Sequence, residues 1–265
     1  MRLGIVLPEG REAELARLAE EHGLFGVLAG TGNPLTAITA ATYASTATEF
    51  ARVVVRVTLG LEHPVLIAEE LAVLDNVNNG RTIVLADSGH LDEAAAEDEV
   101  AVLRESLASR PIQHVGPVWK VPAGLPANPQ APSSIAVTPK PPQLEVPFWV
   151  TGGVAAAVAE RQGVPVFAHA PDQGAAGGLV QPARDAITGD LARDRDRVSS
   201  WARAGFTHLF IDLPDAPIGE VMINVSRHLA PEVAMPHFPR VMSQSKVPLQ
   251  WPDSARRIDS RDGHH

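Results

Sequence analysis

The chain has 265 residues, a formal net charge of -9 and no cysteine. The negative charge argues against a nucleic-acid or anionic-membrane partner, and the lack of cysteine excludes disulfides, thiolate metal sites and a cysteine nucleophile. No segment approaches the roughly 20 apolar residues of a membrane span, and no signal-peptide pattern is present, so we expect a soluble, cytoplasmic protein.

The first half of the chain alternates between short apolar runs and amphipathic stretches. The apolar runs predict strands at 3–7, 25–29, 52–61 and 82–86. The amphipathic stretches predict helices at 12–21, 34–47, 64–77 and 91–109. Strand–helix units at this spacing imply parallel strands with right-handed crossovers. Both a doubly wound sheet and a barrel, which needs about 250 residues, have this pattern.

Residues 111–147 interrupt the pattern, because they hold ten prolines. That density excludes a helix and predicts an extended excursion, which scattered apolar side chains hold against the protein. The alternation then resumes, with strands predicted at 147–151, 165–169 and 208–213 and helices at 154–161, 191–204 and 218–229. No seventh strand is assigned within 170–190. We expect one domain over 1–240 and a surface or partly disordered tail over 241–265.

The helix predicted at 64–77 has an inward stripe with helical spacing. The stripe consists of Ile67, Leu71 and Leu74, and it is widened by Leu66, Val73 and Val77. Three charged residues follow this helix face and the turn after it: Glu70, Asp75 and Arg81. They are expected at the amino-terminal end of the strand predicted at 82–86, as a structural network of ion pairs and turn contacts.

The run from 33 to 89 resembles the bacterial-luciferase-like monooxygenases, which depend on a flavin or on the deazaflavin F420. The matching pieces are Asn33-Pro34-Leu35, His63-Pro64, Ala68-Glu69, Leu74-Asp75 and Gly80-Arg81. PFWVTGG at 147–153 is similar to the family's strand five and glycine turn, and HLFIDLP at 208–214 to its last strand. The resemblance implies an α/β fold, a (β/α)8 TIM barrel that is either complete or shortened between strands six and eight.

The resemblance also implies an activity. The implied enzyme is an oxidoreductase or monooxygenase that uses reduced FMN and O2 on a small organic substrate, and it acts as a homodimer. One alternative is an F420-dependent hydride-transfer enzyme. Another is a non-catalytic barrel that has lost its flavin site and binds no cofactor. The second alternative is supported by the end of strand four, where Asp87-Ser88-Gly89 replaces the family's glycine-rich pattern.

The carboxyl ends of the strands carry the function of a barrel. These ends supply the predicted cofactor-binding residues: Ala29, Gly30, Thr58, Gly60, Asp87, Ser88, Thr151, Gly152 and Gly153. Gly152 and Gly153 at a helix start would hold a flavin phosphate, or they form an ordinary tight turn. Asp87 and Ser88 would hydrogen-bond a flavin ring edge or the substrate, or Asp87 caps the next helix.

Four histidines have different predicted roles. His90 and His169 fall at mouth positions and are the candidate acid/base residues. His63 precedes a helix and is expected to position it, whereas His208 begins a strand and is expected to be structural. No two histidines have metal-ligand spacing with a nearby carboxylate, so no metal site is predicted.

Overall fold

The structure is a computed structural model that describes residues 1–123, 132–168, 179–180, 188 and 190–213. Its parallel strands are β1 (Arg2–Val6), β2 (Gly26–Ala29), β3 (Arg52–Thr58), β4 (Thr82–Asp87), β7 (Phe148–Thr151), β8 (Phe167–Ala168), β9 (Leu179–Val180) and β10 (His208–Ile211). The helices are α1 (Glu12–Glu21), α2 (Ala37–Thr46, after a 3-10 turn at Pro34–Thr36), α3 (Pro64–Val77), α4 (Glu93–Leu107), α5 (Ala155–Gln162) and α6 (Leu191–Arg203). Every strand and helix predicted within the described ranges is present, with ends shifted by a few residues.

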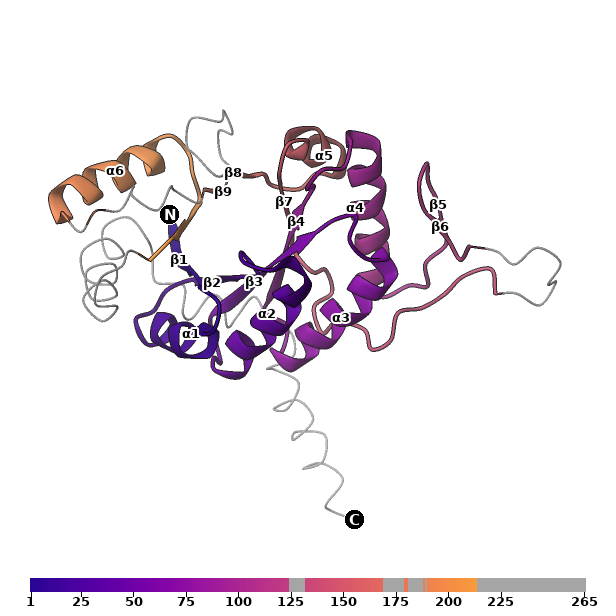
Figure 1. Ribbon diagram of the computed structural model, residues 1–265, viewed down its shortest axis with the longest axis horizontal. Coiled ribbons are helices and arrows are strands. Elements are labelled where there is room, and N and C mark those ends of the chain that lie inside the picture. The colour runs from indigo at the N-terminus through magenta and orange to yellow at the C-terminus, as the bar shows by residue number, and fades with distance from the viewer. Residues whose placement is uncertain (124–131, 169–178, 181–187, 189, 214–265) are drawn as a thin grey trace, which may run out of the picture.

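The parallel strands form one eight-stranded sheet in the order β7-β4-β3-β2-β1-β10-β9-β8. The outer strands of this order meet at a parallel bridge between Val150 and Val166. There the Val150 N–H donates to the Pro165 carbonyl oxygen at 3.0 Å. The strands therefore form a TIM barrel with a short seam between β7 and β8, and the helices lie on its outside (Figure 1). The seventh strand, which the sequence did not reveal, is β9.

The strands are buried on both faces, as their nearly continuous apolar runs predict. Alternate side chains fill the barrel interior, among them Val6, Leu28, Val54, Ile83, Leu85, Trp149, Phe167 and Phe210. The other side chains of the same strands, such as Val53 and Val55, pack under the surrounding helices. Trp149 and Phe167 stack inside the barrel with ring centroids 6.3 Å apart.

The outer face of α3 differs from the prediction. Its inward stripe is buried as expected: Ile67, Leu71 and Leu74. The residues expected to widen that stripe are instead 46–48% exposed: Leu66, Val73 and Val77. The prediction that these three residues extend the buried face of the helix was wrong, because their side chains lie on the side of α3 that faces away from the barrel.

The network at the amino-terminal end of β4 consists of hydrogen bonds. Arg81 donates to the carbonyl oxygens of Ala51 at 2.6 Å and Thr48 at 2.7 Å, and burial lowers its pKa to about 10. Asp75 accepts from the Thr82 N–H at 3.2 Å. Asp75 and Arg81 form no direct salt bridge within the described part of the chain, so the expected ion pair is reduced to an electrostatic attraction that partly offsets the lowering of the Arg81 pKa. Glu70 was misplaced, since it is exposed midway along α3.

The proline-rich excursion packs on the protein through part of its apolar residues, whereas Val115, also expected to lie against the protein, is 76% exposed. It contains a two-stranded antiparallel hairpin, β5 (His114–Val115) and β6 (Lys120–Val121). Its described apolar residues Ile112, Val121 and Val137 are 1–3% exposed. The helix predicted at 218–229 and the tail at 241–265 lie outside the described residues. Within the described part of the chain, no helix is both long and apolar enough to cross a membrane.

Candidate functional site

Three of the predicted site residues lie side by side at one end of the barrel. The register pairs Thr58 with Asp87 across β3 and β4, and Asp87 with Thr151 across β4 and β7. Backbone hydrogen bonds continue past the strand ends, from the Leu59 N–H to the Asp87 carbonyl and from the Ser88 N–H to the Thr151 carbonyl, both 2.9 Å. Since all three strands are parallel, these polar side chains form a layer at the carboxyl end of the barrel.

Asp87 is held by an arginine from the neighbouring strand. Arg56 of β3 donates to Asp87 Oδ2 from Nε at 3.0 Å and from Nη2 at 2.6 Å. The other carboxylate oxygen, Oδ1, accepts from the Gly89 N–H at 3.0 Å. The prediction that Asp87 caps the next helix was wrong, because Asp92 accepts the Ala95 N–H and caps α4.

Sequence reasoning missed Arg56. It interrupts the valine-rich strand RVVVRVT, in which the flanking valines are buried. Its side chain is 26% exposed, against 11% for Asp87, so the ion pair lies at the accessible end of the barrel. A charged residue inside a strand covered on both faces needs a partner, and that rule would have singled out Arg56.

Gly152 lies directly against Ser88. Gly152 has φ +102°, and a Cβ added to it would lie 2.2 Å from Ser88 Oγ and 2.9 Å from Asp87 Oδ1. Ser88 Oγ is buried and has no hydrogen-bond partner within the described structure. The turn after β7 therefore requires glycine at 152, both for its backbone conformation and for its close approach to β4.

The helix after this turn begins without a cap. Val154 precedes α5 and makes no side-chain cap hydrogen bond, and the first turn has no acidic residue. By contrast, Asp92 and Asp190 cap α4 and α6. A Cβ on Gly153 would meet nothing within 4 Å. The open, positive start of α5 suits an anion such as a phosphate group.

The other predicted residues at the strand ends shape the loops or belong to the core. Gly60 has φ +80° and donates its N–H to the buried carboxylate of Glu99 at 2.9 Å. Burial raises the pKa of that Glu99 carboxyl group. Gly30 has φ +83°, and a Cβ there would lie 2.5 Å from the Cβ of Ala37. Ala29 is fully buried in the core under the helices.

The structure separates the four histidines. His90 is exposed in the loop after β4, and His169 lies outside the described residues. His63 Nδ1 accepts from the Val65 N–H at 3.2 Å, so His63 positions α3 as predicted. His208 starts β10 at the opposite end of the barrel, where its ring centroid is 4.8 Å from that of Phe25. Within the described ranges, no group of histidine and acidic residues could hold a metal ion.

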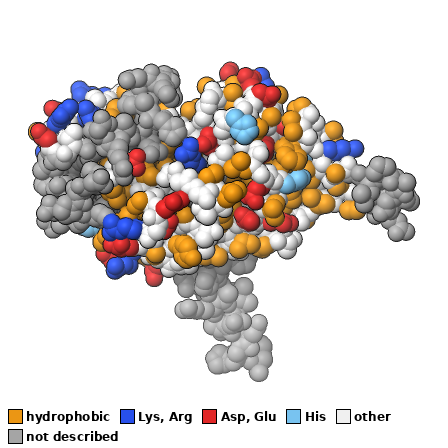
Figure 2. Space-filling model, viewed as in Figure 1, with side chains coloured by type: hydrophobic (Ala, Val, Ile, Leu, Met, Phe, Trp, Pro, Cys, Tyr) orange, Lys and Arg blue, Asp and Glu red, His pale blue; other side chains and the backbone are white. Residues whose placement is uncertain are grey.

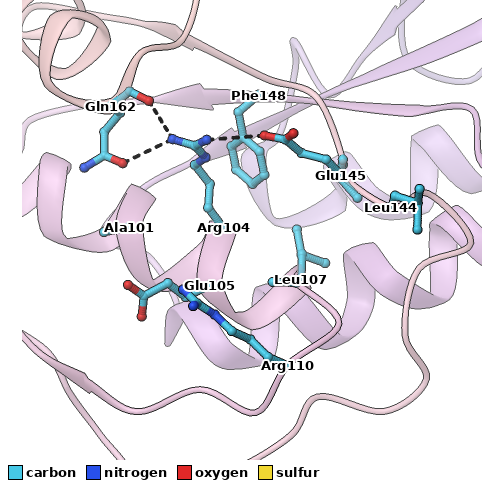
Figure 3. Close-up of a pocket in the computed structure, with 11 residues that line it drawn as sticks. Ala101, Arg104, Glu105, Leu107, Arg110, Leu144, Glu145, Phe148 and Gln162 are labelled. Carbon is cyan, nitrogen blue, oxygen red and sulfur yellow. Dashed lines mark hydrogen bonds and ion pairs between the residues drawn. The ribbon is translucent and has the colours of Figure 1, made fainter.

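A cavity of about 480 Å³ lies away from this site, between α4 and α5 (Figure 3). Phe148, at the start of β7, lines it. Arg104 crosses it and donates to the Gln162 carbonyl oxygen at 2.6 Å. Arg104 also approaches Glu145 Oε1 at 3.5 Å. Because Phe148 starts β7, this cavity is at the amino-terminal end of the barrel. Its arginine, Arg104, already has hydrogen-bond partners.

A second cavity, of about 200 Å³, lies between α2 and α3. Thr58 at the end of β3 lines it, together with Glu62 and Glu70. It is thus adjacent to the layer of polar strand ends, on the outer side of the barrel.

Comparisons with solved structures show the same fold in oxidoreductases. The monooxygenase RslO1 from Streptomyces bottropensis has a TM-score of 0.67 and 17% identity, covering 87% of this chain and 99% of its own. The oxygenating constituent of 3,6-diketocamphane monooxygenase from Pseudomonas putida, in complex with FMN, has a TM-score of 0.64 and 12% identity, covering 88% and 99%. The coenzyme F420-dependent tetrahydromethanopterin reductase from Methanopyrus kandleri has a TM-score of 0.63 and 14% identity, covering 88% and 99%.

A search among curated proteins gives no significant match. The family model described as luciferase-like monooxygenase matches residues 8–187. That range contains the strand ends of β2, β3, β4 and β7 and the uncapped start of α5. The chain belongs to the luciferase-like monooxygenase family.

Proposed function

We propose that this protein is a flavin-dependent oxidoreductase of the luciferase-like class, which acts on a small organic substrate with reduced FMN and O2. The observation that carries the proposal is the register of Thr58, Asp87 and Thr151 beside the uncapped start of α5. A polar layer and an anion site at the same end of a barrel are what a phosphate-bearing cofactor needs.

The residues present fit such a cofactor. The N–H groups around Gly153 and in the first turn of α5 would hold the FMN phosphate. The polar side chains of Thr58 and Thr151 would lie along the edge of the ring system. FMN, when bound, supplies the redox chemistry with O2. The chain's part is to orient the ring and the substrate and to keep water away from them.

Hydride transfer with F420 is the second candidate. The observation in its favour is the relative from Methanopyrus kandleri, whose name states F420 dependence. F420 also carries a phosphate, so the start of α5 suits both cofactors.

A barrel without a cofactor is the third candidate, and the Arg56–Asp87 ion pair favours it. This pair lies at the mouth end of β4, where the sequence departs from the glycine-rich family pattern. In that case the protein would serve as a binding or accessory protein.

Titration separates the three candidates. The purified protein is titrated with FMN and with F420, each oxidised and reduced, while absorbance and flavin fluorescence are followed. Micromolar binding of FMN supports the first candidate and micromolar binding of F420 alone supports the second. Failure of both cofactors to bind in either redox state would refute both enzyme candidates and leave the accessory barrel.

We also propose a homodimer that forms through α2 and α3. Apolar side chains are exposed on these helices: Tyr43, Leu66, Val73 and Val77, which are 46–57% exposed. On α3 the last three fall on one stripe because they are seven and four residues apart. Hydrophobic side chains gather at the lower edge of the molecule, over α2 and α3 (Figure 2). Exposed apolar side chains grouped on one helix face are typical of a protein interface. The exposed Glu70 lies on the same stripe, between Leu66 and Val73.

A further inference from the structure

Arg56 projects into the barrel and not toward the helices. Val54, two residues earlier on β3, belongs to the cluster that fills the barrel interior. Side chains two residues apart on a strand share a face, so Arg56 lies above that cluster. Its register partner on β4 is Leu85, another interior residue. The guanidinium group therefore lies between an apolar interior and the mouth of the barrel.

Asp87 occupies only some of the N–H donors of this guanidinium group. Arginine carries five N–H donors, and Arg56 spends one on Asp87 from Nε and one from Nη2. Nη1 makes no hydrogen bond with any residue that the structure describes. The side chain is 26% exposed, so these donors can be reached from the mouth.

Asp87 fixes the orientation of the guanidinium group but does not occupy all of its N–H donors. Both carboxylate oxygens of Asp87 are engaged, Oδ2 by Arg56 and Oδ1 by the Gly89 N–H. The planar guanidinium is thereby held in one position before any ligand arrives, which lowers the entropic cost of binding. Arginine forks of this kind match the geometry of carboxylates and other oxyanions.

We propose that the free edge of the Arg56 guanidinium binds an anionic oxygen of a ligand in the barrel mouth. The substrate class this assigns is a small organic acid, or a compound that reacts as an enolate or phenolate. The anionic ring of a reduced flavin carries the same chemistry and is the other source of such an oxygen. The inference rests on the proposed function only in taking the mouth as the active site.

The first test uses benzoate and its neutral analogue benzamide as probes, with no flavin present. Isothermal titration is expected to show benzoate binding at least about tenfold tighter than benzamide, which one charge-assisted hydrogen bond supports. Arg56→Met is expected to abolish this preference, and Arg56→Lys to retain part of it. Arg161→Met is the matched control, because Arg161 is an exposed arginine that pairs with Glu97 of α4. It is expected to bind both probes as the wild type does.

Asp87→Asn is expected to change the affinity for benzoate in the opposite direction from Arg56→Met. Without the neutralising carboxylate, the charge of Arg56 is uncompensated, so benzoate binding is expected to tighten severalfold. A purely structural ion pair predicts that Arg56→Met and Asp87→Asn both weaken binding. Far-UV circular dichroism establishes that each variant is folded, and Arg56→Lys replaces Arg56→Met if the latter does not fold.

A second arm identifies the source of the oxyanion. If the source is a reduced flavin, Arg56→Met weakens the binding of reduced FMN at least about tenfold more than that of oxidised FMN. If the source is the substrate, only the benzoate preference responds. The inference is overturned if neither the benzoate preference nor the redox dependence of FMN binding changes in Arg56→Met. Failure of the protein to bind FMN would refute the proposed function and leave the benzoate arm intact.

Discussion

Arg56 and Asp87, 31 residues apart in the chain, form an ion pair across β3 and β4 at the carboxyl end of the barrel. Asp92 caps α4, so Asp87 is not needed for that helix. Removing one partner of a largely buried pair leaves an uncompensated charge. The pair lies in the polar layer that the strand register also gives Thr58 and Thr151, so its two charges are the ones that a ligand meets there.

The glycine turn after β7 gives the first prediction. Gly152→Ala is expected to lower the free energy of unfolding by about 1–3 kcal/mol, the range for a strained backbone position. The cause is its φ of +102° and the 2.2 Å approach of the new Cβ to Ser88 Oγ. Urea unfolding measures the difference. Gly153→Ala is the control, expected within about 0.5 kcal/mol of the wild type, because a Cβ there meets nothing within 4 Å. Equal losses in both variants would contradict this account of the turn.

Asp98 of α4 anchors the proline-rich excursion. Its Oδ2 accepts from the N–H groups of Val118 at 2.9 Å and Trp119 at 2.7 Å, and its Oδ1 lies 2.8 Å from His114 Nε2. Burial opposes ionisation of Asp98, but the hydrogen bonds from Trp119, His114 and Val118 outweigh it, so its pKa lies below the usual value. A folded-state pKa below the unfolded one means that the unfolded state binds more protons in this window. The stabilisation is thus complete above the usual aspartate range and is lost as the pH falls through the lowered pKa.

Asp98→Asn is therefore expected to lower the unfolding free energy by about 1–3 kcal/mol near pH 7, since it removes an acceptor of buried donors. The gap to the wild type is expected to shrink at acid pH, as the pH falls below the usual aspartate range through the lowered pKa of Asp98. Urea unfolding at both pH values measures it. Glu97→Gln, one position away and paired with exposed Arg161, should differ from the wild type by less than about 0.5 kcal/mol at either pH. A gap for Asp98→Asn that stays constant across this range would be evidence against the anchor.

The outer face of α3 gives a prediction about assembly. Val73→Lys is expected to convert the proposed homodimer into a monomer, because Val73 is 48% exposed at the middle of the apolar stripe. Sedimentation velocity measures the change. Leu144→Lys is the control, since Leu144 is 85% exposed and precedes β7, away from α3. A wild type that sediments as a monomer at micromolar concentration would rule out this interface.

The alternation of strands and helices was predictable from the sequence because their apolar residues recur with different periods. That alternation fits an open sheet as well as a barrel, and only the resemblance to the luciferase-like family implied the barrel. The short seventh strand was not predictable, since β9 spans two residues, Leu179–Val180, and has no periodicity to read. The outward direction of Leu66 and Val73 was also hidden, because a helix that is apolar on most sides does not reveal which side meets the barrel.

The candidate site was predictable in position and less so in chemistry. The rule for strand ends located Thr58, Asp87 and Thr151, which the register brings together. The role of Asp87 depends on a partner 31 residues earlier, and spacing alone does not indicate that partner. The environment of Ser88 was not predictable either, because its buried hydroxyl group lies against Gly152, which is distant in the sequence.

The uncapped start of α5 gives a prediction about the cofactor. Ala156 is exposed in the first turn of α5. Ala156→Asp is expected to weaken FMN binding at least about tenfold, since it places a negative charge where the phosphate would lie. An aspartate in a first helical turn stabilises the helix itself, so a loss of binding would not reflect unfolding. Ala156→Asn, which is neutral, is the control and should bind FMN nearly as the wild type does.

The most direct measurement of the central claim is a fluorescence titration of the wild-type protein with FMN and with riboflavin, which lacks the phosphate. FMN binding is expected in the micromolar range and at least about tenfold tighter than riboflavin binding, because the phosphate makes a charge-assisted contact. The Ala156→Asp variant should lose this difference and bind both compounds equally. Equal binding of FMN and riboflavin by the wild type, or binding of neither, would contradict the proposed phosphate contact.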